Sequence, residues 1–387
     1  GGDTYNQNYE YSRMAIDLAL GRGGDQVVVK EGENVVYYGG NSKQVEKNTR
    51  VKARVKAHAL REIIESREHV MIMGHSISDT DAFGAAIGIY CAARVLGKKA
   101  QIVLDQVTSS LRPLKEGFTT EKGYPPDMFV SSERALELTD YNTLVMVVDV
   151  NRPSHTECPG LLKRTDSIVV FDHHRQSSEV ISNPVLSYIE PYASSTCEMV
   201  AEVLQYFTEN IKLAPHEADC IYAGILIDTS NFMTKTGVRT FEAAAYLKRC
   251  GAEVTRVRKM LRNDMDAYKA RAEVVRHAEV YRGAFAISIC PADKIESPTI
   301  VGAQAADELL NIVGIKASFV LTEYQGKIYV SSRSIDEINV QKIMERLGGG
   351  GHLNMAGCQL RDCTVSQAKR IIEDTIDEML EEGDIEE

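Results

Sequence analysis

The sequence places a histidine and two aspartates within seven residues, directly after an apolar stretch. In MIMGHSISDTDAFGAA, residues 71–86, these side chains are His75, Asp79 and Asp81. Two carboxylates this close repel each other and lose solvation in a crevice, so a bound cation is the usual reason why such an arrangement persists. Capping of the following helix could explain one of the carboxylates, but not both together with the histidine. We interpret the stretch as part of a metal site.

Three further groups of titratable side chains follow apolar stretches. Asp149 ends the run LVMVVDV, the triplet Asp172, His173 and His174 follows SIVVF, and Asp228 closes an apolar helical run. Asp149 alone could start a turn, and Asp172 could be a cap beside two loop histidines. A buried, unpaired carboxylate at a helix C-terminus is unfavourable, since the helix dipole repels it and water is missing. A nearby cation would remove that cost for Asp228.

The elements that must position these residues alternate between strands and helices. The strands are expected at 70–73, 100–104, 143–150 and 167–171, and the helices at 81–96, 195–208, 215–227 and 240–249. This alternation predicts an α/β fold with a mostly parallel sheet flanked by helices. Three of the four strands end at a polar cluster, and ligands of open α/β sheets lie outside the carboxyl ends of the strands. We therefore expect the clusters to meet at one edge of the sheet.

Together these groups offer two imidazoles and four carboxylates as possible ligands, and His174 is a further histidine beside them. Such oxygen-rich sites suit Mn²⁺ or Mg²⁺, whereas structural zinc calls for thiolates or a closed tetrahedral set. Four carboxylates exceed what one ion needs for charge neutrality. Two ions bridged by one carboxylate are used to activate water and to stabilise a phosphoryl oxygen in in-line displacement. The residues therefore favour hydrolysis of a phosphoester.

A second group of residues lies near the C-terminus, in SSRS at 331–334 and LGGGGHLNMAG at 347–357. Four successive glycines could form a backbone nest for an anion, and Arg333 and His352 could add charge-assisted bonds to phosphate. A glycine run is also a common flexible turn. Around these segments FAISIC, SFVLTEY and KIYVSSRS predict strands and 365–380 a closing helix, which indicates a second, smaller α/β domain. The segment 195–198 fits a capping box and is interpreted as structural.

Composition excludes some classes of function. The formal net charge of −11 argues against tight, sequence-indifferent binding to long nucleic acid, but it is compatible with a small phosphorylated substrate. The 8 cysteines form no CxxC pair, which indicates a reduced, cytosolic protein. No stretch is apolar over the length that a bilayer requires. Because the first residue is Gly, we expect a piece of a longer protein, in which case any membrane anchor would lie outside this sequence.

Taken together, the motifs resemble a known family. GHSISDTDA, VVDVNRP, FDHHR and GILIDTSNF are similar in order and spacing to the DHH phosphoesterase superfamily, and SSRS with GGGGHLNMAG resembles its associated DHHA1 domain. The resemblance covers residues from about 57 to 387 and departs from the family pattern at Met355, where the family has a second alanine. ALGRGGDQVVVK resembles the last helix and turn of a degenerate GGDEF domain. This combination is typical of the membrane-anchored GGDEF-DHH-DHHA1 cyclic-di-AMP phosphodiesterases of bacteria.

The resemblance implies a division of the chain into four parts, with a cleft between the two larger domains. These parts are a GGDEF remnant and linker at 1–55, a DHH catalytic domain at 56–250, a helical linker at 251–281 and a DHHA1 substrate-binding domain at 282–387.

The resemblance also assigns roles to residues. One manganese would be held by His75, Asp79 and Asp149, and the other by Asp81, Asp149, His173 and Asp228. His174 would face the scissile phosphate, while Asp172 would orient a histidine. The remaining residues would bind substrate from the DHHA1 domain: Arg333, Ser334, Gly349, Gly350, Gly351 and His352.

The implied activity is hydrolysis of cyclic-di-AMP to linear 5'-pApA by two Mn²⁺ ions, which would lower the level of this second messenger. Mg²⁺ could substitute for Mn²⁺, and the protein could form a homodimer. One alternative within the same enzyme class is a nanoRNase or pAp phosphatase that acts on short linear oligonucleotides. Another is a sensor that binds a nucleotide without catalysis, although sensors of this kind should lack metal ligands and this chain lacks none.

Overall fold

The computed structural model describes residues 2, 4–21, 26–32, 34–39, 50–176, 179–209, 211–262, 265–292, 295, 297–335 and 338–385. The chain divides into two compact units, Gly1–Leu261 and Arg262–Glu387. Each unit has its own 6-stranded sheet and its own apolar core. The predicted α/β class, with a larger and a smaller domain, is confirmed.

The sheet of the first unit is parallel throughout and has the order β5-β4-β3-β6-β7-β8. Its strands are β3 (His69–Met73), β4 (Lys99–Val103), β5 (Phe129–Val130), β6 (Thr143–Val148), β7 (Ile168–Asp172) and β8 (Leu186–Ile189). The sequence predicted four of them. The two edge strands were missed because β5 has only two residues and β8 is short and partly polar. The order makes β3, β6 and β7 neighbours, so their carboxyl ends lie side by side.

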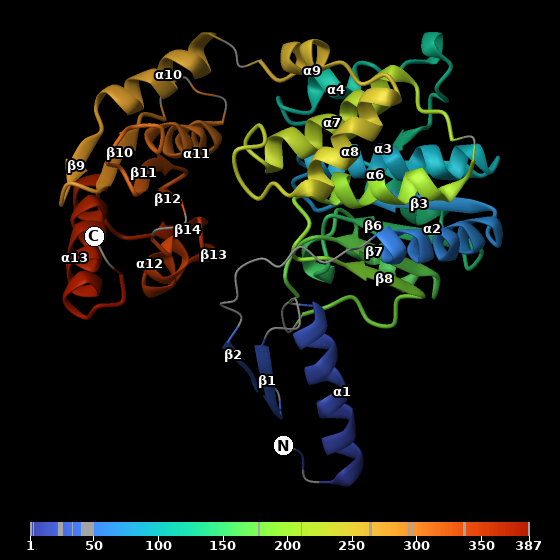
Figure 1. Cartoon of the computed structure of the whole chain (residues 1–387), viewed down its shortest axis with the longest axis horizontal. Coiled ribbons are helices and arrows are strands. Elements are labelled where there is room, and N and C mark those ends of the chain that lie inside the picture. The colour runs from blue at the N-terminus through green and yellow to red at the C-terminus, as the bar shows by residue number, and fades with distance from the viewer. Residues whose placement is uncertain are drawn as a thin grey trace. The chain divides into compact units, whose positions relative to one another are not determined.

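Helices cover both faces of this sheet. They are α2 (Arg50–Glu65), α3 (Thr80–Val95), α4 (Arg112–Lys115), α5 (Ser132–Leu138), α6 (Thr196–Phe207), α7 (Pro215–Asp228), α8 (Val238–Arg249) and α9 (Val254–Met260), with 3-10 turns at Thr120–Lys122, Pro153–His155 and Pro159–Lys163. Alternate side chains of the strands face two cores, because successive residues of a strand point to opposite sides. Figure 1 shows α3, α6, α7 and α8 together above the strands β6, β7 and β8. Ile72 and Met146 pack with α2, α3, α6, α7 and α8, whereas Val145 and Val147 pack with α5.

Helices α3, α6 and α7 approach one another closely because glycines line their contacts. A Cβ atom on Gly84 of α3 would lie 2.5 Å from the carbonyl oxygen of Cys220 in α7. A Cβ atom on Gly224 of α7 would collide with Sγ of Cys197 in α6. The close approach brings the first turn of α3, with Asp81, against the start of α6.

The N-terminal segment forms α1 (Tyr5–Gly21), β1 (Gln26–Glu31) and β2 (Asn34–Gly39), and the two strands pair antiparallel. Its assignment to a GGDEF remnant stays a prediction, and 40–49 lies outside the described residues. Helix α2 follows and contributes buried Leu60 and Ile64 to the core.

The second unit contains a mixed sheet of order β13-β14-β12-β11-β10-β9, in which only the pair of β10 and β11 is parallel. Its strands are β9 (Glu279–Tyr281), β10 (Phe285–Cys290), β11 (Ala317–Tyr324), β12 (Lys327–Ser334), β13 (Gly350–His352) and β14 (Met355–Leu360). One face packs against α10 (Met265–Arg276) and α11 (Pro298–Leu309), and the other against α12 (Val340–Arg346) and α13 (Val365–Glu381).

The division between the units falls inside the predicted linker at 251–281. Each of the two helices there contributes to a core: Val257 of α9 is buried in the first unit and Val274 of α10 in the second. Among the described residues, no helix combines the length and the apolar character that crossing a membrane demands.

Replacing Gly84 by alanine should destabilise the first unit. The new methyl group would press on the backbone of α7, and overpacking of this kind costs about 1–3 kcal/mol, offset in part by the higher helix propensity of alanine, about 1 kcal/mol. Thermal or urea unfolding would measure the change. The control is Gly160→Ala, where the added atom would lie 3.1 Å from Cδ2 of the Leu136 side chain, which can move. Equal stability of both variants would contradict the close contact of α3 and α7.

Candidate metal centre

The sequence clusters meet at the carboxyl ends of three adjacent strands. His75 follows β3 after one glycine, Asp149 comes directly after β6, and His173 comes directly after β7. Asp228 is the last residue of α7, and Asp81 lies in the first turn of α3. The structure thus brings together side chains from five elements, which lie in four separate stretches of the sequence.

Asp149 and His173 lie at the centre of the cluster. His173 Nε2 is 3.4 Å from Asp149 Oδ1, 3.4 Å from Asp228 Oδ2 and 3.9 Å from Asp81 Oδ2. On the other side, His75 Nε2 is 3.7 Å from Asp149 Oδ2 and 3.4 Å from Asp79 Oδ1. Ligand atoms converge in three overlapping groups, each able to hold an ion: His75, Asp79 and Asp149; Asp81, His173 and Asp228; and Asp149, His173 and His174.

The backbone of Asp149 adopts an unusual conformation. Its φ is 61°, in the left-handed region that a residue other than glycine rarely adopts. The amide of Asp149 donates to the carbonyl oxygen of Phe171 at 2.8 Å, which extends the pairing of β6 with β7 by one residue. Backbone strain of this kind persists only where the surrounding structure enforces it, and it is common at functional sites.

The two neighbouring aspartates of the first cluster have different partners. Oδ1 of Asp79 accepts hydrogen bonds from the amides of Asp81 and Ala82, both at 3.0 Å, and so caps α3. The Asp81 carboxylate instead accepts from the amides of Thr196 and Cys197, at 2.7 and 2.8 Å, at the start of α6. Capping therefore explains Asp79 only, as the sequence indicated for one of the pair.

Burial and mutual repulsion disfavour the ionised carboxylates. Burial and the charge of Asp79 raise the pKa of Asp81, and burial with the charges of Asp81 and Asp79 holds the pKa of Asp149 and of Asp228 well above the ordinary value. Burial also acts to raise the pKa of Asp79, but its hydrogen bond with His75 brings it below the ordinary value. Divalent cations would compensate this charge, and an oxygen-rich set with imidazoles fits Mn²⁺ or Mg²⁺.

Asp172 lies beside His174, at hydrogen-bond distance. Its Oδ1 is 2.8 Å from His174 Nδ1 and accepts from the His174 amide at 3.1 Å. Burial alone would lower the pKa of His174, but the bond to Asp172 and its charge raise it overall. Asn151 donates to Asp172 and, at 3.2 Å, to the carbonyl oxygen of His174. The arrangement fixes the orientation of the His174 ring.

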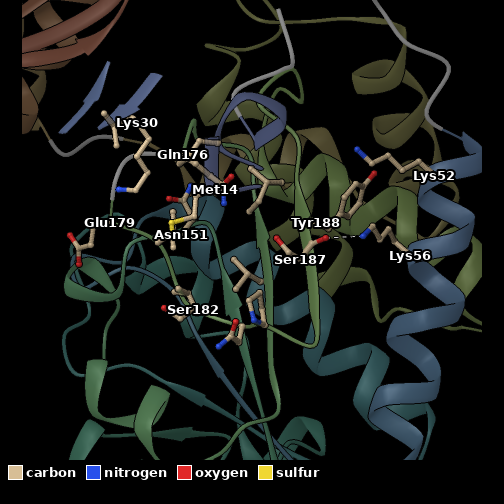
Figure 2. A pocket seen from close by; sticks show the side chains of 18 residues that line it. Met14, Lys30, Lys52, Lys56, Asn151, Gln176, Glu179, Ser182, Ser187 and Tyr188 are labelled. Atoms are coloured by element: carbon tan, nitrogen blue, oxygen red, sulfur yellow. Dashed lines mark hydrogen bonds between the residues drawn. The ribbon is translucent and has the colours of Figure 1, made fainter. Parts of the chain in front are cut away.

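A cavity of about 980 Å³ lies away from the cluster, along β8 and the segment before it (Figure 2). Lys52, Lys56 and Tyr188 line it, and both ammonium groups lie over the Tyr188 ring, 5.7 and 5.8 Å from its centre. The lining contains none of the clustered histidines and aspartates. Asn151 is the residue that both lines the cavity and contacts Asp172. The cavity is therefore distinct from the candidate centre.

In the second unit, Arg333 and Ser334 end strand β12. Arg333 Nε donates to Asp307 Oδ1 at 2.8 Å, with the arginine side chain 11% exposed. The Ser334 hydroxyl is buried and donates to the carbonyl oxygen of Ile338 at 2.6 Å. The structure therefore gives Ser334 a bond within its own turn and Arg333 a carboxylate partner.

Part of the glycine run lies in an edge strand. Gly350, Gly351 and His352 form the edge strand β13, which pairs with β14, and the His352 side chain lies outside what the structure describes. Gly351 has φ 150°, and a Cβ atom on Gly349 would collide with the carbonyl oxygen of Gly357. Gly349 and Gly351 lie too close to β14 for a side chain, whereas a Cβ atom on Gly350 would meet no atom within 4 Å.

Two residues at the cluster were missed by sequence reasoning. Thr196 Oγ1 donates to Asp149 Oδ1 at 2.9 Å, and Asn151 holds Asp172. Thr196 lies in the segment interpreted as a capping box, and Ser195 does accept from the Glu198 amide. The local pattern was sufficient to explain the segment, so nothing in the sequence pointed from Thr196 to a distant aspartate. Asn151 could have been found from its position two residues after Asp149.

Comparison with known proteins agrees with this arrangement. The model of the DHH family, N-terminal domain, matches residues 69–225, and the model of the DHHA1 domain matches residues 285–382. Among solved structures, an exopolyphosphatase-related protein from Bacteroides fragilis has a TM-score of 0.74 at 18% identity, covering 84% of this chain and 96% of that protein. At this identity the likeness concerns the fold alone.

Curated relatives are more similar in sequence. The chain is 43% identical over 377 residues to the cyclic-di-AMP phosphodiesterase GdpP of Geobacillus thermodenitrificans (strain NG80-2) and 42% identical over 381 residues to that of Bacillus subtilis (strain 168). These alignments cover 96% and 97% of the chain, which spans 57% of the length of each relative. The chain is therefore similar to the DHH family, N-terminal domain, over residues 69–225 and to the DHHA1 domain over residues 285–382.

Proposed function

We propose that the chain is the catalytic part of a phosphodiesterase that hydrolyses cyclic-di-AMP to linear 5'-pApA with two Mn²⁺ ions. The observation that carries the proposal is the convergence of carboxylates and imidazoles around Asp149, which belongs to two of the groups able to hold an ion. The names of the 42–43% identical relatives support the substrate. The ordinary preference of Mn²⁺ for mixed oxygen and imidazole ligands supports the metal.

One ion would be held by His75, Asp79 and Asp149, and the second by Asp81, Asp149, His173 and Asp228. Two divalent ions at these positions would supply an activated water and charge compensation for the phosphoryl oxygens. Asp149 would contribute to both ion sites, since its carboxylate lies with His75 and Asp79 in one group and with His173 and His174 in another.

His174 is proposed to orient the scissile phosphate. The bond between its Nδ1 and Asp172 keeps the ring in one orientation, and the raised pKa favours the protonated form, which can donate to an anionic oxygen. Its side chain is 44% exposed, so a substrate can reach it. Asn151 contributes by holding Asp172 in turn.

The second unit is proposed to bind the substrate through Arg333, Ser334 and residues 349–352. Arg333 carries the charge that a phosphate requires, and Asp307 keeps its guanidinium in one orientation. The domain boundaries proposed are a GGDEF remnant and linker at 1–55, a DHH domain at 56–250, a helical linker at 251–281 and a DHHA1 domain at 282–387. The full-length protein is proposed to be anchored in the cell membrane, with this piece on the cytoplasmic side.

Replacing Asp149 by asparagine should abolish the reaction while the shape of the site is kept. The amide removes the charge that both ions share, so we expect activity on cyclic-di-AMP to fall by at least about 100-fold and bound Mn²⁺ to fall below two ions per chain. Activity assays and metal analysis would measure this. The control is Asp140→Asn, an exposed carboxylate near the opposite end of β6. Full activity of Asp149→Asn would contradict the mechanism.

The substrate is tested separately, with cyclic-di-AMP and linear pApA assayed side by side at equal concentration. Cleavage of the cyclic dinucleotide with accumulation of pApA is the expected result. Faster cleavage of pApA than of cyclic-di-AMP would instead favour the enzyme that acts on short linear oligonucleotides.

Stability of the metal-free protein should depend on pH in a direction that the carboxylates set. The folded pKa values of Asp81, Asp149 and Asp228 lie above the ordinary 3.8, so the folded chain binds more protons than the unfolded chain in this range. Stability should therefore fall as pH rises from about 4 toward the folded pKa values, because the folded carboxylates must ionise side by side.

Thermal unfolding with and without Mn²⁺ at several pH values would test this. Mn²⁺ competes with protons for the same oxygens, so its stabilising effect should grow as pH rises. Asp149→Asn should make the metal-free melting temperature less dependent on pH. A stabilisation by Mn²⁺ that is independent of pH would argue against binding at these carboxylates.

A further inference from the structure

We propose that Thr196 is a positioning residue of the metal centre: its hydroxyl holds the Asp149 carboxylate so that each oxygen faces a different group of metal-binding side chains. The inference rests on the proposed function, since it concerns the two ions of that site. It assigns a role to a residue whose sequence context indicates only the start of a helix.

The geometry of the Asp149 carboxylate distinguishes its two oxygens. Oδ1 accepts the bond from Thr196 Oγ1 at 2.9 Å and is the oxygen 3.4 Å from His173 Nε2. Oδ2 is the oxygen 3.7 Å from His75 Nε2. Rotation of the carboxylate would exchange these environments, and the bond from Thr196 opposes that rotation. Both residues are buried, Thr196 at 0% and Asp149 at 3% exposed, so water does not compete for the bond.

The backbone of Asp149 is already fixed by its own contacts. Its amide is bonded to the Phe171 carbonyl oxygen, and its φ of 61° is held by the ends of β6 and β7. The remaining freedom lies in the side-chain torsions of Asp149. The Thr196 hydroxyl restricts these torsions, because it donates a hydrogen bond to the Asp149 carboxylate.

Thr196 also links the two central carboxylates. Its amide donates to Asp81 Oδ2 at 2.7 Å, while its hydroxyl donates to Asp149. One residue therefore sets the relative position of two proposed ligands that come from α3 and from the end of β6. A β-branched side chain suits this task because few χ1 rotamers are open to it.

The start of α6 is itself held firmly. The Ser195 hydroxyl accepts from the Glu198 amide at 3.0 Å and caps the helix. The Glu198 carboxylate accepts from the hydroxyls of Ser194 and Thr240, each at 2.6 Å. These bonds tie α6 to the residues just before it and to α8. The position of the Thr196 hydroxyl is thus determined by the fold and does not depend on a bound ion.

The test measures Mn²⁺ binding by titration calorimetry and unfolding of the metal-free protein by melting. Thr196→Val keeps the shape and removes the hydroxyl, and we expect Mn²⁺ affinity to fall about 10- to 100-fold for at least one ion. Thr196→Ser keeps the hydroxyl and should restore the affinity to within a few-fold of wild type. The matched control is Thr143→Val: Thr143 is buried, and its hydroxyl donates to Asp140 at 2.8 Å near the opposite end of β6.

A purely structural role would lower the melting temperature of Thr196→Val and of Thr143→Val alike and would leave Mn²⁺ affinity unchanged in both. That result would overturn the proposal, as would Thr196→Ser binding Mn²⁺ as weakly as Thr196→Val. Asp149→Asn, measured in the same titration, separates this failure from failure of the metal centre. Wild-type Mn²⁺ affinity in Asp149→Asn would refute the centre and the role of Thr196 together, whereas a loss there with none in Thr196→Val would refute the role of Thr196 alone.

Discussion

The structure of the first unit depends on a balance between repulsion and support among buried carboxylates. Asp81, Asp149 and Asp228 lie around one imidazole, where burial and mutual charge oppose their ionisation. A fold keeps such a cluster only if other groups stabilise the charge. The parallel sheet brings the residues together, since β3, β6 and β7 are neighbours, and the helices around them supply the donors.

The close packing of helices α3, α6 and α7 also stabilises a buried carboxylate, that of Asp81. The small residues of α3 and α7 let both helices approach α6, and this approach places two amides of α6 on the Asp81 carboxylate. A helix N-terminus carries partial positive charge, so the contact stabilises the ionised form of Asp81. Helix α6, which supports Asp81, is thus held in place by close contacts with glycines of α3 and α7, where larger side chains would not fit.

Sequence reasoning could predict the acids and histidines because each group follows an apolar strand or closes an apolar helix, and the ends of parallel strands share an edge. It could not predict that β3, β6 and β7 are adjacent, because strand order depends on contacts between distant segments. Thr196 was missed for a related reason, since a local capping pattern already explained its segment. The glycine run at 348–351 was expected to be a nest or a flexible turn, and the pairing of Gly350 and Gly351 with β14 could not be predicted because it joins segments through a sheet whose order the sequence does not reveal.

The support given to the four carboxylates is unequal, and the inequality follows from the helix ends that they meet. Asp79 caps α3, Asp81 lies at the N-terminus of α6, and Asp149 accepts from the first residue of α6. Asp228 instead ends α7, where the helix dipole adds to the repulsion; the His173 ring lies 3.4 Å away, and the charge of Lys235 offsets the raised pKa only in part. Because Asp228 has the least support from the protein, its ionisation depends most on a cation beside His173, which ties the end of α7 to the occupancy of the centre.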